Sequence, residues 1–338
     1  MTRELHLSVT LGSAGPRPAA HWTGLVQLAE LGALDFVALD DSLDPADGDG
    51  RLDAVAVLAH AAARTSRIGL IPTVTTTHTE PFHTSSALAT LDFVSEGRAG
   101  WLVDVSTTEE AARATGRRDP APAPELWAEA SDAAEAAARL WDSWEDDAEI
   151  RDTATGRFID RERLHHVDFE GPRFSVRGPS IVPRPPQGRP PVAVVLDAQA
   201  SDARWELAAR HAEIVLLDAD SPAAAREAHT ELRRRAGRDD LRVLIRVGLA
   251  PGALAGVTET LDALPDLLAD WHAEAGTDGF HLVTTTPTEE LPAVIHDVVP
   301  ALRTRGLFRA THTGRTLRDH LGLSRPDSRY AVRTEAAL

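Results

Sequence analysis

The 338-residue sequence contains no cysteine, no lysine and no asparagine, and each absence removes a class of chemistry. Without cysteine there are no disulfides, thiolate metal sites, iron–sulfur clusters or cysteine nucleophiles. Without lysine there is no Schiff base, no attachment of pyridoxal phosphate and no Walker-type nucleotide loop. Without asparagine there is no acceptor for N-glycosylation. All basic residues other than histidine are therefore arginines, a usage that fits a high-GC genome.

Positive charge is also scarce, with 35 Lys+Arg against 52 Asp+Glu and a formal net charge of -17. Such an acidic chain is not expected to bind nucleic acid, because the phosphate backbone attracts basic surfaces. No apolar run approaches the roughly 20 residues of a membrane span, and the first residues lack the basic start of a secretory leader. The sequence predicts a cytoplasmic protein of ordinary globular composition, with no membrane partner.

Short apolar runs alternate with amphipathic stretches along most of the chain. The predicted strands are 5–11, 34–39, 67–74, 98–105, 191–196, 213–217, 241–249 and 279–284. The predicted helices are 19–31, 52–63, 86–94, 125–144, 203–211, 223–236, 259–275 and 289–302. Eight such units predict an α/β fold, a closed (β/α)8 TIM barrel. An open doubly wound sheet is the alternative, although the first strand runs into Gly12-Ser13-Ala14-Gly15-Pro16 rather than G-x-G-x-x-G.

Two segments depart from this rhythm, and a third ends it. Residues 107–124 are polar and rich in Pro and Ala, and residues 145–190 form an insertion after the fourth helix in which a small hairpin is expected around Gly171-Pro172. Loops of this length usually act as lids or binding loops. The C-terminal tail, 303–338, is polar with little to bury. We expect residues 1–338 to form one barrel domain that carries this insertion and this tail.

In such a barrel the site lies at the C-terminal ends of the strands. Asp40-Asp41 follows the second strand and is either a turn and helix cap or a functional carboxylate pair. A run of threonines ends the third strand, and it is either a strand edge or a ligand contact. His78 and His83 follow as candidate catalytic residues, with loop or cap roles as the alternative. No metal site is predicted, because His165-His166 has no third ligand at helical spacing.

The chain resembles the bacterial-luciferase-like flavin monooxygenases, and most closely their nitrilotriacetate and dibenzothiophene-sulfone monooxygenase branch. The resemblance lies in EPFH (80–83) and ATLDFVSEGRAGW (89–101), and in LWDSWEDDA with the following GRFIDRERLHHVDFEGPRFSVRGP. It continues in PRPPQGRPPV before ELAARHAEIV, in DGFHL, and in VVPALRTRGLFR before GRTLRDHLGLSRP. These segments span most of the chain in the family's order.

The resemblance implies a barrel that oxygenates a small organic substrate with O₂, using reduced FMN (FMNH2) from a separate flavin reductase that binds transiently. It also implies a homodimer or a paired subunit. Carried over by position, the expected cofactor-binding residues are Asp41, Thr73, Thr75, Trp101, Ser106, Ser201 and Arg204. The chain departs from the family's pattern at Leu102, Ala123, Trp127 and Gln199. The alternative is therefore a barrel that has lost flavin and serves as a non-catalytic partner or ligand-binding subunit. A flavin-independent hydrolase would need a nucleophile motif, and G-x-S-x-G is absent.

Overall fold

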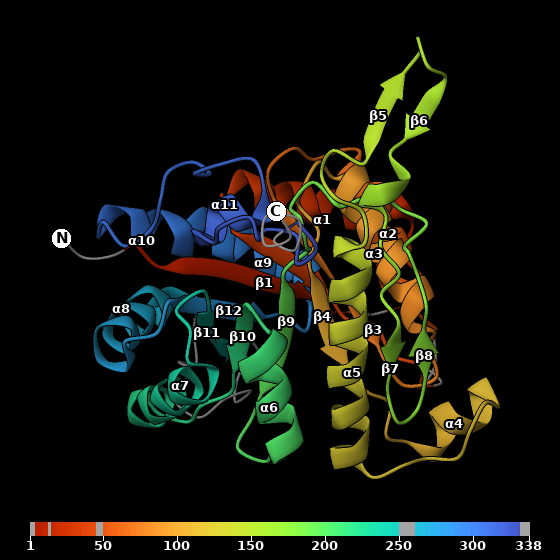
Figure 1. The fold of residues 1–338 in the computed structure, drawn as a ribbon. Coiled ribbons are helices and arrows are strands. Elements are labelled where there is room, and N and C mark those ends of the chain that lie inside the picture. The colour runs from red at the N-terminus through yellow and green to blue at the C-terminus, as the bar shows by residue number, and fades with distance from the viewer. Residues whose placement is uncertain (1–3, 13–14, 45–49, 250–260, 332–338) are drawn as a thin grey trace.

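The computed structural model describes residues 4–12, 15–44, 50–249 and 261–331. Eight parallel strands close into a ring in the order β1-β12-β11-β10-β9-β4-β3-β2 (Figure 1). They are β1 (His6–Leu11), β2 (Phe36–Leu39), β3 (Gly69–Thr75), β4 (Trp101–Asp104), β9 (Val192–Leu196), β10 (Ile214–Leu217), β11 (Arg242–Gly248) and β12 (Gly279–Val283). The predicted (β/α)8 barrel is confirmed, and the open sheet is excluded.

Helices surround this ring. They are α1 (Ala19–Leu31), α2 (Ala54–Ala62), α3 (Pro81–Val94), α4 (Glu109–Thr115), α5 (Ala123–Asp142), α6 (Asp202–His211), α7 (Pro222–Ala236), α8 (Leu264–Ala275), α9 (Pro287–Ala293), α10 (Val299–Thr304) and α11 (Leu317–Leu321). Single turns lie at η1 (Arg161–Arg163), η2 (Leu261–Ala263) and η3 (Val294–Val298). α4 was not expected from the polar segment 107–124; Thr108 caps its start by accepting a hydrogen bond from the Ala111 N–H.

Alternate residues of each strand face the barrel interior and the surrounding helices, as the period of a strand requires. Leu7 and Val9 of β1 belong to the large apolar core between strands and helices. Phe36, Ile71 and Leu102 belong to a second apolar core inside the ring. This inner core fills the lower, N-terminal half of the barrel, so the interior is packed there and polar only toward the C-terminal ends of the strands.

The insertion 145–190 lies outside the strand ring and carries two hairpins. The first pairs β5 (Glu149–Asp152) with β6 (Arg157–Ile159), was not expected from the sequence, and stands out from the body (Figure 1). The second pairs β7 (Phe169–Glu170) with β8 (Ser175–Val176) at the predicted Gly171-Pro172 turn. Phe169 and Val176 pack on α5, which holds this part of the insertion against the helix layer.

The tail corrects the sequence analysis, because it is not a polar appendage. Leu317 and Leu321 of α11, together with Leu323, are buried in the inner core and close the N-terminal end of the barrel. Between them Arg318 is 3% exposed and forms two 2.7 Å hydrogen bonds with the Glu213 carboxylate. The expectation failed because the three leucines are scattered among polar residues, whose charges are satisfied within the protein.

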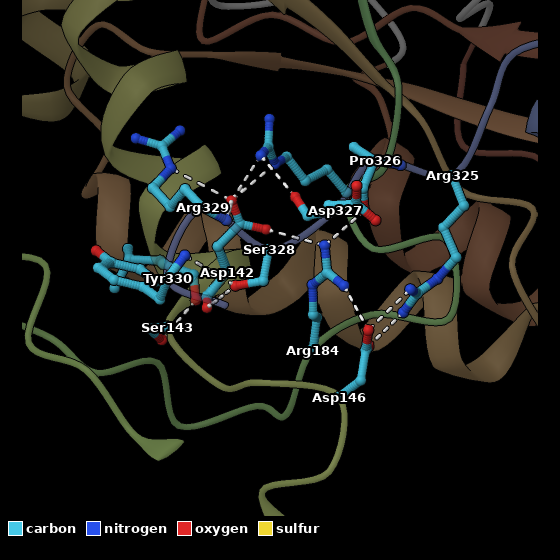
Figure 2. A network of polar contacts seen from close by, with 12 residues as sticks. Asp142, Ser143, Asp146, Arg184, Arg325, Pro326, Asp327, Ser328, Arg329 and Tyr330 are labelled. Atoms are coloured by element: carbon cyan, nitrogen blue, oxygen red, sulfur yellow. Dashed lines mark hydrogen bonds and ion pairs between the residues drawn. The ribbon is translucent and has the colours of Figure 1, made fainter. Parts of the chain in front are cut away.

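A second anchor of the tail is the buried carboxylate of Asp142, at the end of α5 (Figure 2). It is fully buried and takes the guanidinium of Arg189 at 2.7 Å, with Arg184 and Arg329 each at 3.3 Å. Arg329 comes from the tail, whereas the other two arginines come from the segment before β9. One buried charge therefore joins three parts of the chain, since removing any partner would leave it uncompensated.

We predict that Leu321→Ala lowers the free energy of unfolding by about 2–5 kcal/mol, because it removes a fully buried side chain from the barrel floor. Urea unfolding followed by circular dichroism would measure the change. Leu31→Ala is the matched control, since Leu31 is 71% exposed and should lose far less. Equal losses in the two variants would contradict the assignment of α11 as the barrel floor.

Candidate functional site

The barrel interior becomes polar just above the apolar floor. Ser8 and Thr10 of β1 point inward, and their hydroxyls lie 2.8 Å and 2.5 Å from the two ring nitrogens of His281 on β12. The imidazole is fully buried and stacks on Phe36. Burial lowers the pKa of His281 to about 3, and Arg246 adds to the effect. The neutral ring therefore forms a fixed polar base beneath the mouth.

A layer of charges lies above this base, at the C-terminal ends of the strands. Arg246 of β11 forms an ion pair with Asp218 at 2.8 Å, and Arg204 of α6 forms one with Asp197 at 3.0 Å. Asp40 and Asp104 belong to the same layer, because Asp40 interacts electrostatically with both Arg246 and Asp104 across the interior. Burial raises the pKa of Asp40, Asp104 and Asp218. Perturbed carboxyl groups in a concave region are typical of functional sites.

The expected threonine and serine residues form one wall of this mouth. The hydroxyls of Thr75 and Ser106 lie 3.2 Å apart, and the backbone N–H of Ser106 donates to the Thr77 hydroxyl at 3.1 Å. Thr73 lies two residues before Thr75 on β3 and is 5% exposed. The structure thus brings together residues from β3 and from the segment after β4, as parallel strands of one ring allow.

Ser201 and Arg204 lie at the start of α6, on the same rim. Ser201 caps the helix by accepting a hydrogen bond from the Arg204 N–H at 3.4 Å. The Arg204 guanidinium stacks over the ring of Trp127 of α5, 4.4 Å from its centroid. Arg204 is therefore held by an aromatic ring on one side and by Asp197 on the other, rather than extending freely toward solvent.

Asp41 has a structural task in addition to its place after β2. Its carboxylate accepts hydrogen bonds from the backbone N–H groups of Ser42, at 2.8 Å, and Ala54, at 2.9 Å. Ala54 is the first residue of α2, so Asp41 fixes the path from the strand to the helix. The neighbouring Asp40, rather than Asp41, faces the charged layer.

Trp101 does not join the mouth. It is 1% exposed, packs edge-to-face on Trp141 at 6.5 Å and donates its indole N–H to the Val74 carbonyl. These contacts place its side chain in the helix layer, because inward positions on β4 belong to Leu102 and Asp104. The expected contact of Trp101 with a cofactor in the mouth is therefore corrected, and Trp101 is not part of the candidate site.

The two histidines expected to be catalytic lie apart from this layer. His83 is exposed on the first turn of α3 and lines a groove of about 430 Å³ between α2 and α3, on the outside of the barrel. His78 follows β3 in a left-handed conformation, with φ of 65°. Its carbonyl accepts from Arg117, and burial with Arg118 and Arg117 nearby lowers its pKa. Within the described part of the chain, neither imidazole forms a hydrogen bond with the Thr75–Ser106 wall.

The sequence analysis missed one residue of the mouth, Arg246. The signal was present, since an arginine interrupts the apolar run of β11 at an inward-facing position. Of the departures from the family's pattern, Leu102 is in the apolar floor and Ala123 is exposed at the start of α5. Within the described ranges, no three His, Asp or Glu side chains are arranged to hold a metal ion. No described helix is long and apolar enough to cross a bilayer.

Comparison with known proteins gives a consistent set of relatives. A family model described as "Luciferase-like monooxygenase" matches residues 5–294. One of the two listed pristinamycin IIA synthase subunits of Streptomyces pristinaespiralis is 32% identical over 97% of this chain and 98% of its own. N-acetyl-S-(2-succino)cysteine monooxygenase of Bacillus subtilis (strain 168) is 29% identical over 91% and 90%. The crystal structure of a long-chain alkane monooxygenase has a TM-score of 0.86 at 22% identity, covering 98% of this chain and 100% of the other.

We predict that acid destabilises the fold through His281. The unfolded chain takes up a proton below its ordinary pKa of 6.5, whereas the folded protein does so only near about 3. The free energy of unfolding should therefore fall by up to about 1.4 kcal/mol per pH unit between these values from this residue. His281→Gln should reduce that slope between pH 6 and pH 4, as measured by urea unfolding. His83→Gln is the control, and equal slopes in the wild type and His281→Gln would contradict the prediction.

Proposed function

Because this chain belongs to the luciferase-like monooxygenase family, we propose that it is a two-component monooxygenase that uses reduced flavin and O₂ to oxygenate a small organic substrate. The observation that carries this proposal is the convergence of Thr75, Ser106 and Arg204 on one end of a closed barrel. In TIM barrels this is the end that carries the active site. The substrate would be held there, with the cofactor delivered by a separate flavin reductase.

The mouth has groups that suit the two ends of FMN. At the α6 end, backbone N–H groups and the Arg204 guanidinium suit a phosphate. The Nε of Arg204 is a buried donor with no hydrogen-bond partner among the described residues. At the other end, the hydroxyls of Thr75 and Ser106 suit the polar edge of the isoalloxazine. We propose that Ser201 and Arg204 hold the phosphate, and that Asp41, Thr73, Thr75 and Ser106 surround the ring.

When bound, reduced FMN supplies the electrons that activate O₂. The protein's own residues then position the ring and exclude water from it. The apolar floor closed by α11 blocks access from below, since Leu102, Leu317 and Leu321 fill that end of the barrel. The reaction would therefore take place above His281, which presents a neutral, fixed surface.

A specific observation also favours a second candidate function. Among the described residues of the charged layer, four carboxylates face two guanidiniums, and this surplus opposes a phosphate. Two of the relatives are named as different subunits of one synthase, pristinamycin IIA synthase. The alternative is therefore a paired subunit whose barrel no longer binds flavin. Flavin binding separates the two functions.

We predict that Arg204→Gln weakens FMN binding at least tenfold, because it removes a charged hydrogen bond worth about 1.5–3 kcal/mol. Riboflavin lacks the phosphate, so its affinity should not change. Equilibrium dialysis of the full chain with each flavin, oxidised and reduced, would measure both affinities. Arg226→Gln, an exposed arginine on α7, is the matched control.

Three other outcomes would count against parts of this assignment. An equal loss of FMN and riboflavin affinity in Arg204→Gln would show that Arg204 does not contact the phosphate. Unchanged FMN binding in that variant would show the same. If neither flavin binds the wild type at millimolar concentration, the monooxygenase proposal fails and the paired-subunit alternative is favoured.

A further inference from the structure

Asp40 is a charged residue in the mouth to which neither the family likeness nor the proposed cofactor contacts assign a role. It is the first residue after β2, where Phe36 and Ala38 face the barrel interior, so the alternation of the strand turns Asp40 inward as well. Its electrostatic partners support this direction, because Arg246 and Asp104 come from β11 and β4. Asp40 therefore faces the space in which a substrate would lie.

The arginines of the mouth are already engaged by other carboxylates. Arg246 is bonded to Asp218 at 2.8 Å and Arg204 to Asp197 at 3.0 Å. Among the described residues, no arginine forms an ion pair with Asp40. Residues 13–14, 45–49 and 250–260 contain no arginine or lysine, so the sequence offers no basic side chain there either. The mouth thus retains negative charge that the protein itself does not neutralise.

A second, independent feature lies on the neighbouring strand. The Thr73 side chain is 5% exposed and lies near Asp40. Its hydroxyl has no completed hydrogen bond with any described residue. A buried hydroxyl is normally hydrogen-bonded, and a hydroxyl can both donate and accept. Asp40 and Thr73 together therefore offer acceptors, on adjacent strands, that a ligand with N–H groups would satisfy.

We infer that Asp40 and Thr73 form a subsite for a protonated amine, so that the substrate is an organic amine rather than a carboxylate. This inference rests on the proposed function, because it names the substrate class of the same mouth. An ammonium group has three donors and a full positive charge, which suits one carboxylate and one hydroxyl. Charge-assisted hydrogen bonds of this kind are about twice as strong as neutral ones.

The surroundings of Asp40 support this assignment energetically. Burial raises the pKa of Asp40, and the negative charge of Asp104 adds to the rise. The ionised carboxylate is thus less stable in the mouth than it would be in water. A bound cation would offset that cost, whereas a bound carboxylate would increase it. The same balance gives Asp40 a part in selecting substrates by charge.

The test uses three ligands of similar size and different charge: benzylamine, benzyl alcohol and benzoate. Isothermal titration of the flavin-free full chain near neutral pH would measure each affinity. We expect benzylamine to bind at least tenfold more tightly than benzyl alcohol, and benzoate to bind most weakly. Asp40→Asn should abolish the preference for the amine, and Thr73→Val should reduce it. Arg246→Gln should increase it, since Asp218 is then released.

Asp239→Asn is the matched control, because Asp239 is an exposed carboxylate at the opposite end of the barrel and should leave all three affinities unchanged. Thermal unfolding of each variant checks that the fold is retained. The inference is overturned if the wild type binds benzylamine no more tightly than benzyl alcohol, if no benzylamine binding is measurable, or if Asp40→Asn keeps the preference.

This experiment can fail independently of the proposed function. If FMN binds but the amine preference is absent, the amine subsite is wrong and the monooxygenase proposal stands. If the amine preference depends on Asp40 but neither oxidised nor reduced FMN binds, the cation subsite stands and the monooxygenase proposal fails. In that case the barrel would be an amine-binding subunit.

Discussion

The pairing of β1 with β12 is the contact on which the mouth depends, because it converts a row of strands into a ring. Residues far apart in the sequence then face one interior, such as Thr10 and His281, whose hydrogen bond spans the closure. Gly279 makes this pairing close, since a Cβ there would lie 2.0 Å from the His6 carbonyl oxygen. Without the closure, the carboxylates on β2, β4 and β9 would not share a space.

The ring is filled differently at its two ends, and the difference separates stability from function. At the lower end, apolar side chains and buried arginine–carboxylate pairs such as Arg318–Glu213 hold the tail in place. At the upper end, charged groups are incompletely matched, and burial raises the pKa of Asp40 and Asp104. A site that must bind a ligand keeps such unsatisfied groups, whereas a floor that must only be stable does not.

The sequence predicts the strands well, because buried parallel strands are continuous apolar runs. It predicts less of the mouth. Thr75 and Ser106 could be placed on one rim from the strand order alone, but the outward turn of Trp101 depends on the pleat of a four-residue strand. The role of α11 was hidden for another reason, since Leu317 and Leu321 are separated by charged residues that look solvated in the sequence. Whether a charge is exposed or paired is a property of the folded chain.

The position of the floor residues also determines when the barrel can be finished. β1 is made first, yet its partner β12 ends at Val283, and Leu323 follows later still. During synthesis on the ribosome, the early strands therefore wait with one edge unpaired and the inner core open at its base. Such edges and apolar surfaces favour aggregation. A nascent chain released before Leu323 would retain all eight strands and still be unsealed.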